Sequence, residues 1–65
     1  MGATYYQALT ALLKNNGCVF VRQGKGDHEI WYSPHTKRNI IVDKGGKVRH
    51  TANNTLKTAG LPKAF

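Results

Sequence analysis

Apolar residues near the start of the chain recur at steps of three and four positions. Four of them fall on one face of a helix, namely Tyr6, Leu9, Leu12 and Leu13. Gly17 follows this run, and glycine readily adopts the left-handed conformation that ends many helices. The pattern therefore predicts an amphipathic helix over Thr4–Asn16.

Three short segments rich in β-branched and aromatic residues come next. They are Cys18–Gln23, His28–Ser33 and Asn39–Asp43, separated by turn-forming residues at Gly24–Asp27 and Pro34–Arg38. Consecutive strands joined by short connections pair antiparallel. The segments therefore predict a three-stranded antiparallel sheet.

A second helix is predicted from about Ala52 to Ala59, after a break in the pattern. Thr51 is its expected N-cap, and Gly60 followed by Pro62 is expected to end it. The order helix, strand, strand, strand, helix predicts an α+β fold. Both helices cover one face of the sheet in this fold, and the other face stays open to water.

Alternation along the central strand leaves two registers for the sheet. The first buries Trp31 with Cys18 and Phe20 under Leu9, Leu12 and Leu13, and turns His28 and Tyr32 toward water. The second buries Val19, Val21, Ile30 and Tyr32 instead. We favour the first, because a buried His28 would need a hydrogen-bond partner that the sequence does not identify.

Composition bounds the size of the protein and the kind of partner. The 65 residues are enough for one domain, residues 1–65, with one thin core. Ten Lys and Arg against three Asp and Glu give a formal net charge of +7, which favours a polyanionic partner such as nucleic acid. Cys18 has no disulfide partner, and no secretory signal or membrane-length segment is present, so a cytoplasmic protein is expected.

His28 is the candidate for proton-transfer chemistry. Imidazole exchanges protons near neutral pH, and His28 follows a turn whose glycines allow a phosphate backbone to approach closely. The same residues are compatible with a purely structural hairpin, in which the glycines satisfy the turn conformation. Asp27 either orients the imidazole or is an ordinary turn residue.

Other common sites are poorly supported. Gly24-Lys25-Gly26 lacks a third glycine and joins two strands, which excludes a dinucleotide-binding loop. The histidines His28, His35 and His50 are widely spaced, and one cysteine cannot build a zinc site. No metal or cofactor is therefore expected.

Basic residues lie at strand ends, in turns and before the second helix. The candidates for binding RNA phosphates are Arg22, Lys25, Gly26, Lys37, Arg38 and Arg49. Arg49 is notable because the N-terminus of a helix offers unpaired N–H groups to a phosphate.

Several of these features occur together in a known order. They are Gly17 before an apolar strand, Arg22-Gln23, a glycine-rich turn with His28, and Thr51 followed by Leu56-Lys57-Thr58-Ala59-Gly60-Leu61. This order, from about Leu9 to Leu61, resembles the HicA toxins of bacterial HicA–HicB toxin–antitoxin pairs. The family's usual Gly-Ser-His is Gly26-Asp27-His28 in this chain, so the serine is not matched.

The resemblance implies a double-stranded-RNA-binding-domain-like fold and metal-independent cleavage of messenger RNA that arrests growth. It also implies that His28 is catalytic and that a HicB-type antitoxin masks it. Cleavage without a metal uses the ribose 2′-OH as nucleophile, which requires a base, an acid and positive charge. His28 would supply one proton-transfer role, while Arg22, Lys25 and Arg49 hold the phosphate.

Two other functions fit the same residues. One is a non-catalytic module that binds structured RNA by shape and phosphate contacts. The other is a protein-interaction domain whose basic face meets an acidic partner.

Overall fold

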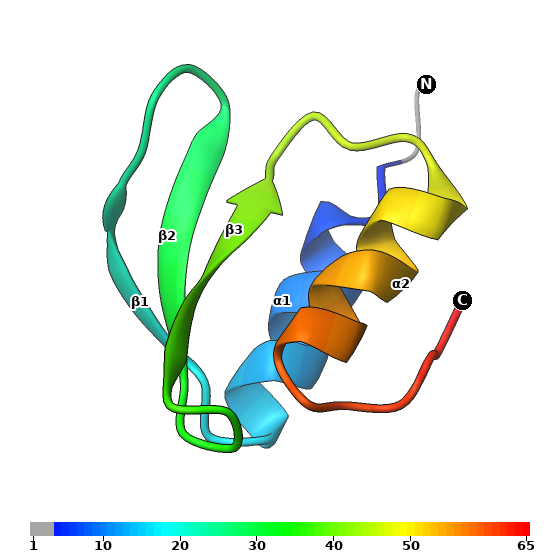
Figure 1. The fold of residues 1–65 in the computed structure, drawn as a ribbon. Helices are drawn as coiled ribbons and strands as arrows, with labels where there is room; N and C mark the ends of the chain where they lie inside the picture. Colours follow the sequence, from blue (N-terminus) through cyan, green and yellow to red (C-terminus); the bar gives the residue numbers. More distant parts are fainter. Residues whose placement is uncertain (1–3) are drawn as a thin grey trace.

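A computed structural model describes residues 4–65. Residues 1–3 lie outside the described residues. They belong to the predicted domain and to the N-terminal segment in which no secretory signal is expected. The elements are α1 (Tyr6–Asn15), β1 (Val19–Gln23), β2 (His28–Ser33), β3 (Arg38–Asp43) and α2 (Arg49–Thr58). Both helices lie on the same side of the sheet (Figure 1). The predicted α+β arrangement is confirmed.

The three strands form one antiparallel sheet in the order β1-β2-β3. The β2–β3 register places Ser33 opposite Arg38 and His28 opposite Asp43. In β1 the register shifts between Phe20 and Arg22, which marks a β-bulge. Because β2 is the central strand, β1 pairs with it on one side and β3 on the other.

The core lies between the helices and one face of the sheet. Its largest members are Leu9, Leu13, Trp31, Ile40, Val42 and Leu56, each no more than 3% exposed. Cys18 is also buried and free, as expected from the sequence. In β2, Trp31 faces the helices while His28 is exposed, so the favoured register is confirmed.

Glu29 is buried beside Trp31 and accepts hydrogen bonds from neutral donors. The Tyr6 hydroxyl donates to its Oε1 and Oε2 atoms, both at 3.0 Å, and Trp31 Nε1 donates to Oε1 at 2.9 Å. Burial, the hydrogen bond to Glu29 and the charge of Glu29 raise the pKa of Tyr6. The two bonds from Tyr6 connect α1 to β2, while the Trp31 bond lies within β2.

The expectation that Phe20 is buried is wrong. Its side chain is 50% exposed, although its ring meets Trp31 edge-on with centroids 6.0 Å apart. All of β1 is exposed, because β1 is an edge strand that extends beyond the region covered by the helices (Figure 1).

The expected N-cap of the second helix is also wrong. α2 begins at Arg49, and Val48 in extended conformation is the N-cap, without a side-chain hydrogen bond. Thr51 already lies within the first turn, where its N–H donates to Val48 O at 3.1 Å. The prediction relied on a capping hydroxyl, which this helix start lacks.

Other boundaries differ from the predictions by one or two residues. The first helix starts at Tyr6 and the first strand at Val19. Arg38, expected in the turn, is the first residue of β3.

Candidate functional site

The turn between β1 and β2 holds His28 at the first position of β2. Gly24 N donates to His28 O at 2.8 Å, and His28 N donates to Lys25 O at 3.1 Å. The Gln23 side-chain amide donates to Gly26 O and to His28 O, both at 2.9 Å. The main chain of His28 is thus fixed on several sides, while its side chain is exposed.

Glycine is favoured at positions 24 and 26 of this turn for two different physical reasons. A Cβ atom on Gly24 would lie 3.0 Å from the carbonyl oxygen of His28, so packing disfavours a side chain there. Gly26 has φ +63°, and a Cβ atom on it would meet nothing within 4 Å. Gly26 therefore meets the turn's need for positive φ and leaves open space at this corner.

Asp43 is directly opposite His28 on β3. The main-chain N–H and C=O of His28 both bond on the β1 side, so the two residues form a non-hydrogen-bonded pair. In such pairs the Cβ atoms are about 4.5–5.5 Å apart and share one face. Asp43 Oδ1 accepts a bond from Gly45 N at 3.0 Å, which holds the Asp43 carboxylate at the start of the following loop.

The loop from Lys44 to Val48 lies next to the β1–β2 turn at this end of the sheet. Lys44 N donates to Asp27 O at 2.9 Å, and Lys44 Nζ is 3.4 Å from Gln23 Oε1. A Cβ atom on Gly45 would lie 3.4 Å from Asp27 Oδ2. Asp27 therefore lies against this loop, and Lys44 adds a cation close to the turn.

Asp43 and Lys44 were not among the sequence candidates. A signal was present in the spacing: if the turn Pro34–Lys37 sets Ser33 opposite Arg38, counting back along both strands places Asp43 opposite His28. The length of the β2–β3 turn had to be known before this pairing could be predicted.

The structure brings only part of the basic set near His28. Arg22 on β1 and Lys25 and Gly26 in the turn share the end of the sheet that carries His28. Arg22 is exposed and pairs with Ile30, next to His28 on the open face of the sheet. These three residues therefore lie at the same end of the sheet as His28.

The remaining three basic candidates lie farther away. Lys37, with φ 56°, and Arg38 are at the opposite end of β2, about 16 Å from His28 at 3.3 Å per residue. In Figure 1 their turn is at the bottom and the His28 turn at the top. Arg49 opens α2 on the far side of the Lys44–Val48 loop.

The other two histidines have different surroundings. His35 Nε2 lies 2.6 Å from Asn16 O, which links a turn to the end of α1. His50 is exposed in the first turn of α2. Among residues 4–65, no group of three or more His, Cys, Asp or Glu side chains is placed to hold a metal ion.

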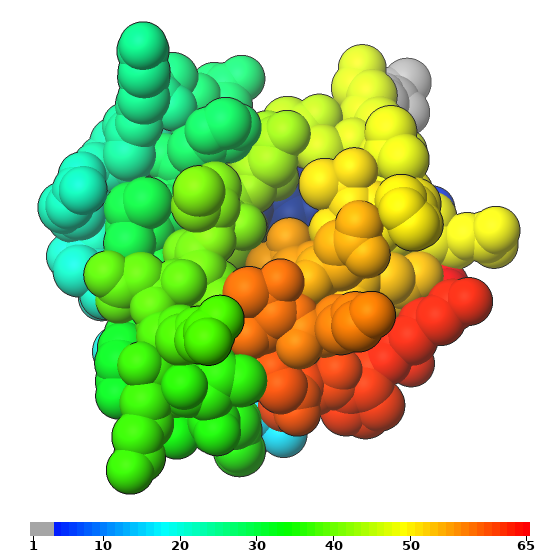
Figure 2. All heavy atoms as spheres, viewed as in Figure 1, coloured from blue at the N-terminus to red at the C-terminus, as the bar shows by residue number. Residues whose placement is uncertain are grey.

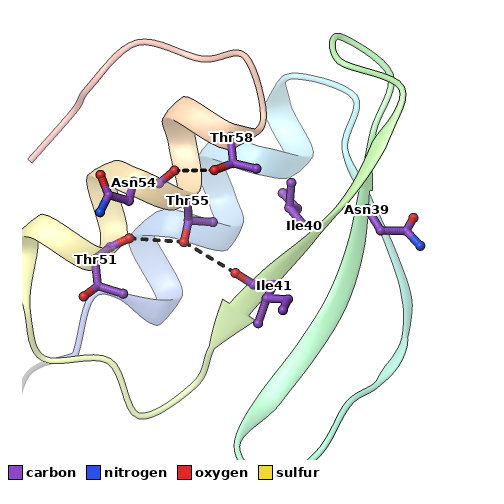
Figure 3. A pocket seen from close by; sticks show the side chains of 7 residues that line it. All are labelled: Asn39, Ile40, Ile41, Thr51, Asn54, Thr55 and Thr58. Atoms are coloured by element: carbon purple, nitrogen blue, oxygen red, sulfur yellow. Dashed lines mark hydrogen bonds between the residues drawn. The ribbon is translucent and has the colours of Figure 1, made fainter.

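A groove of about 310 Å³ runs between β3 and α2, and the surface is hollowed there (Figure 2). Thr51, Thr55 and Thr58 line it from α2, while the Asn39 side chain points away from the helix (Figure 3). Thr55 Oγ1 donates to Thr51 O at 3.2 Å and lies 3.4 Å from Ile41 O, on the outer edge of β3. The groove thus lies between α2 and the outer edge of β3.

Comparisons with known proteins identify one family. The model of the HicA toxins of bacterial toxin–antitoxin systems matches residues 6–61, which is most of the chain. No curated protein and no solved structure gives a match. Within the described residues, neither helix is long and apolar enough to cross a membrane. With residues 6–61 matched by the family model, the chain belongs to the HicA toxin family of bacterial toxin–antitoxin systems.

Proposed function

We propose that this chain is a cytoplasmic endoribonuclease toxin that cleaves messenger RNA without a metal or other cofactor, with His28 as its catalytic residue. The observation that carries the proposal is the exposed imidazole of His28, held at a glycine-containing corner of a protein with net charge +7. Membership of a toxin family adds the biological setting.

The reaction proposed is attack of a ribose 2′-oxygen on the adjacent phosphorus. The 2′-OH loses its proton, the bond from phosphorus to the 5′-oxygen breaks, and that oxygen gains a proton. The products are a 2′,3′-cyclic phosphate and a 5′-hydroxyl. His28 serves as the base or the acid, a role that typically contributes about 10²–10⁴-fold to the rate.

Charge around the phosphate is the second requirement. Arg22, Lys25 and Lys44 surround the corner that presents His28, and cations stabilise the negative charge that develops in the transition state. The open space at Gly26 permits close approach of the phosphate. Arg49 at the start of α2 is proposed to bind a neighbouring phosphate.

Lys37 and Arg38 are assigned a different part of the RNA. Because they lie at the far end of β2, we propose that they contact phosphates several nucleotides from the cleaved bond. Their contribution is to affinity rather than to the chemical step.

Asp43 is proposed to orient the imidazole. Its carboxylate accepts a hydrogen bond from Gly45 N, and Asp43 is opposite His28 in the closest kind of cross-strand pair. Asp27 instead packs against the Lys44–Val48 loop, so it is assigned to the turn.

Inhibition by an antitoxin of the HicB type completes the proposal. A partner that covers His28 and the surrounding cations would exclude RNA by steric occlusion, and acidic groups on it would complement the positive charge. The toxin is then active only when the antitoxin is removed.

The test is cleavage of a labelled single-stranded RNA by the purified chain in EDTA. A matched substrate carries 2′-deoxyribose at the position of cleavage, so that it keeps every phosphate but lacks the nucleophile. We expect the RNA to be cut, with a cyclic phosphate end, and the deoxy substrate to stay intact.

Two results would overturn the proposal. RNA that is bound but remains whole would identify a non-catalytic RNA-binding module. Equal cleavage of both substrates would show that the 2′-OH is not the nucleophile.

A further inference from the structure

A tyrosine and an asparagine lie side by side on the face of the sheet opposite the helices. Tyr32 on β2 and Asn39 on β3 are cross-strand partners. Antiparallel pairs alternate between hydrogen-bonded and non-hydrogen-bonded, and His28 with Asp43, four positions away, is of the second kind, so Tyr32 with Asn39 is as well. In such pairs the Cβ atoms are about 4.5–5.5 Å apart. An aromatic ring is therefore next to a side-chain amide.

The core does not depend on this ring. Trp31 and Ser33, which flank Tyr32 along β2, face the helices and are 2% and 0% exposed, so strand alternation turns Tyr32 to the opposite face. Tyr32 is half-buried and Asn39 is exposed. The Asn39 side chain points away from α2 (Figure 3). Both side chains are thus open to a ligand on the face that carries His28.

Aliphatic side chains border the ring on the same face. Val19 on β1 is the other cross-strand partner of Tyr32 and is 54% exposed. Ile30 on β2 is half-buried, and Ile41 opposite it is 58% exposed. Contiguous apolar surface on a small protein commonly marks an interaction site.

The ring lies between the two ends of the proposed RNA site. Tyr32 is four positions from His28 along β2, which is about 13 Å at the rise of a strand. Lys37 and Arg38 lie just beyond it, in the β2–β3 turn and at the start of β3. An RNA that contacts His28 at one end and these two cations at the other follows β2 and passes over Tyr32.

We propose that Tyr32 is the stacking platform for one unpaired base of the RNA, and that the Asn39 amide hydrogen-bonds the edge of that base. The path of the RNA along β2 rests on the proposed function, and the platform makes single-stranded RNA the substrate class. Proteins that bind single strands stack successive bases on aromatic side chains. An amide carries both donors and an acceptor for a base edge. Bases of a duplex are already stacked and paired, so they do not reach the platform.

Charge favours RNA over a second copy of the chain as the ligand of this face. Two copies would bring bodies of net charge +7 together, within a Debye length of about 8 Å at physiological salt. The acidic side chains of the chain belong to Asp27, Glu29 and Asp43, which lie toward the His28 end of the sheet, and Glu29 is buried. Phosphates near the platform therefore meet little repulsion.

The test measures the affinity of the His28→Ala protein for a short single-stranded RNA by fluorescence anisotropy, so that cleavage does not interfere. In this background Tyr32→Leu removes the ring and keeps an apolar side chain, whereas Tyr32→Phe keeps the ring. The matched control is Tyr5→Leu, because Tyr5 is also half-buried but packs against the core, edge-on to Phe65. Circular dichroism verifies the folding of each variant.

We expect Tyr32→Leu to bind the single strand about tenfold more weakly, as for the loss of one base stack. Asn39→Ala should weaken binding by about fivefold, as for one lost hydrogen bond. Tyr32→Phe and Tyr5→Leu should keep the affinity of the parent protein. A fully paired duplex of the same sequence should bind all these proteins equally.

Abasic nucleotides locate the platform from the side of the RNA. Each position near the cleaved bond is replaced in turn by a nucleotide that keeps its phosphate and lacks its base. We expect the loss of one base to weaken binding as much as Tyr32→Leu does. The same RNA should bind the Tyr32→Leu protein no more weakly than intact RNA does, because one contact is not lost twice.

Four results would overturn parts of the proposal. Unchanged single-strand affinity in Tyr32→Leu would remove RNA as the ligand of this ring. An equal loss in Tyr32→Phe would assign the effect to the hydroxyl group. An equal loss of duplex affinity would show that the unpaired base is not recognised. Unchanged affinity in Asn39→Ala would exclude the amide.

Binding and cleavage decide different claims. If the unmodified chain does not cleave RNA, the proposed nuclease function fails, while the affinities still decide the platform. With His28 present, Tyr32→Leu should raise KM and leave kcat unchanged, because the platform binds substrate and transition state alike. A lower kcat at unchanged KM would contradict a stacking role.

Discussion

His28 and Glu29 are neighbours in sequence with opposite surroundings. Strand alternation turns His28 to water and Glu29 into the core, where Tyr6 and Trp31 donate hydrogen bonds to its carboxylate. Breaking such a bond leaves a buried group with fewer partners, at a cost of about 1–3 kcal/mol. Glu29 thus has a structural role although it adjoins the proposed catalytic residue.

Replacing Tyr6 by Phe tests this role through its pH dependence. Because the pKa of Tyr6 is raised in the folded protein, the unfolded chain loses the phenol proton first as pH rises above about 10. The contribution of the hydroxyl is therefore complete below about pH 10 and is lost as pH rises through the folded pKa. We expect Tyr6→Phe to lower the free energy of unfolding by about 1–3 kcal/mol at neutral pH.

The difference between the two proteins should shrink above about pH 10. Urea denaturation at several pH values between neutral and strongly alkaline gives both free energies. A difference that stays constant or grows over this range would contradict the raised pKa of Tyr6.

The elements illustrate which sequence signals determine structure locally. The three- and four-residue spacing of Leu9, Leu12 and Leu13 predicted α1, since helix periodicity needs no information about tertiary contacts. The strands and their turns were also predicted from local signals, since β-branched and aromatic runs between turn-forming residues need no information about tertiary contacts. Phe20 was misassigned because its exposure depends on how far the helices extend over the edge strand.

The candidate site, like the fold, could be predicted from the sequence only where its residues are close together in the chain. His28 and its turn could be found from local residues, whereas Asp43 and Lys44 depend on the β2–β3 register. Charge alone grouped Lys37 with Lys25, yet the sheet places them at opposite ends. Cross-strand positions require the turn geometry, and a list of basic residues does not contain it.

The start of α2 gives a prediction at this scale. Val48 is the N-cap and has the extended conformation common at that position, but its side chain cannot accept a hydrogen bond. Val48→Thr provides a hydroxyl to the unpaired N–H groups of the first turn. The free energy of unfolding should rise by about 1 kcal/mol in urea denaturation.

Val48→Ala is the control for that change, because it removes the exposed valine without adding an acceptor. Equal stability of the threonine and alanine variants would contradict Val48 as the capping position.

Across the whole molecule, positive charge is spread along the chain rather than held in a tail. Binding of single-stranded RNA should weaken with salt, with a slope of log affinity against log salt of about −0.7 for each phosphate neutralised. Measured in the His28→Ala background, Arg22→Gln should reduce the slope by about 0.7.

Lys63→Gln removes the same charge from the segment after α2, which lies outside the proposed RNA site. The slope should be unchanged in this variant. An equal reduction in both variants would mean that RNA responds to total charge and does not contact Arg22 specifically.

The central claim is that one exposed imidazole carries the chemistry. The most direct measurement is the single-turnover rate of RNA cleavage in EDTA for His28→Ala beside His50→Ala, which removes another exposed histidine, with folding of both verified by circular dichroism. We predict a loss of about 10²-fold or more for His28→Ala and the unmodified rate for His50→Ala. A folded His28→Ala variant that cleaves RNA at the unmodified rate would contradict the account.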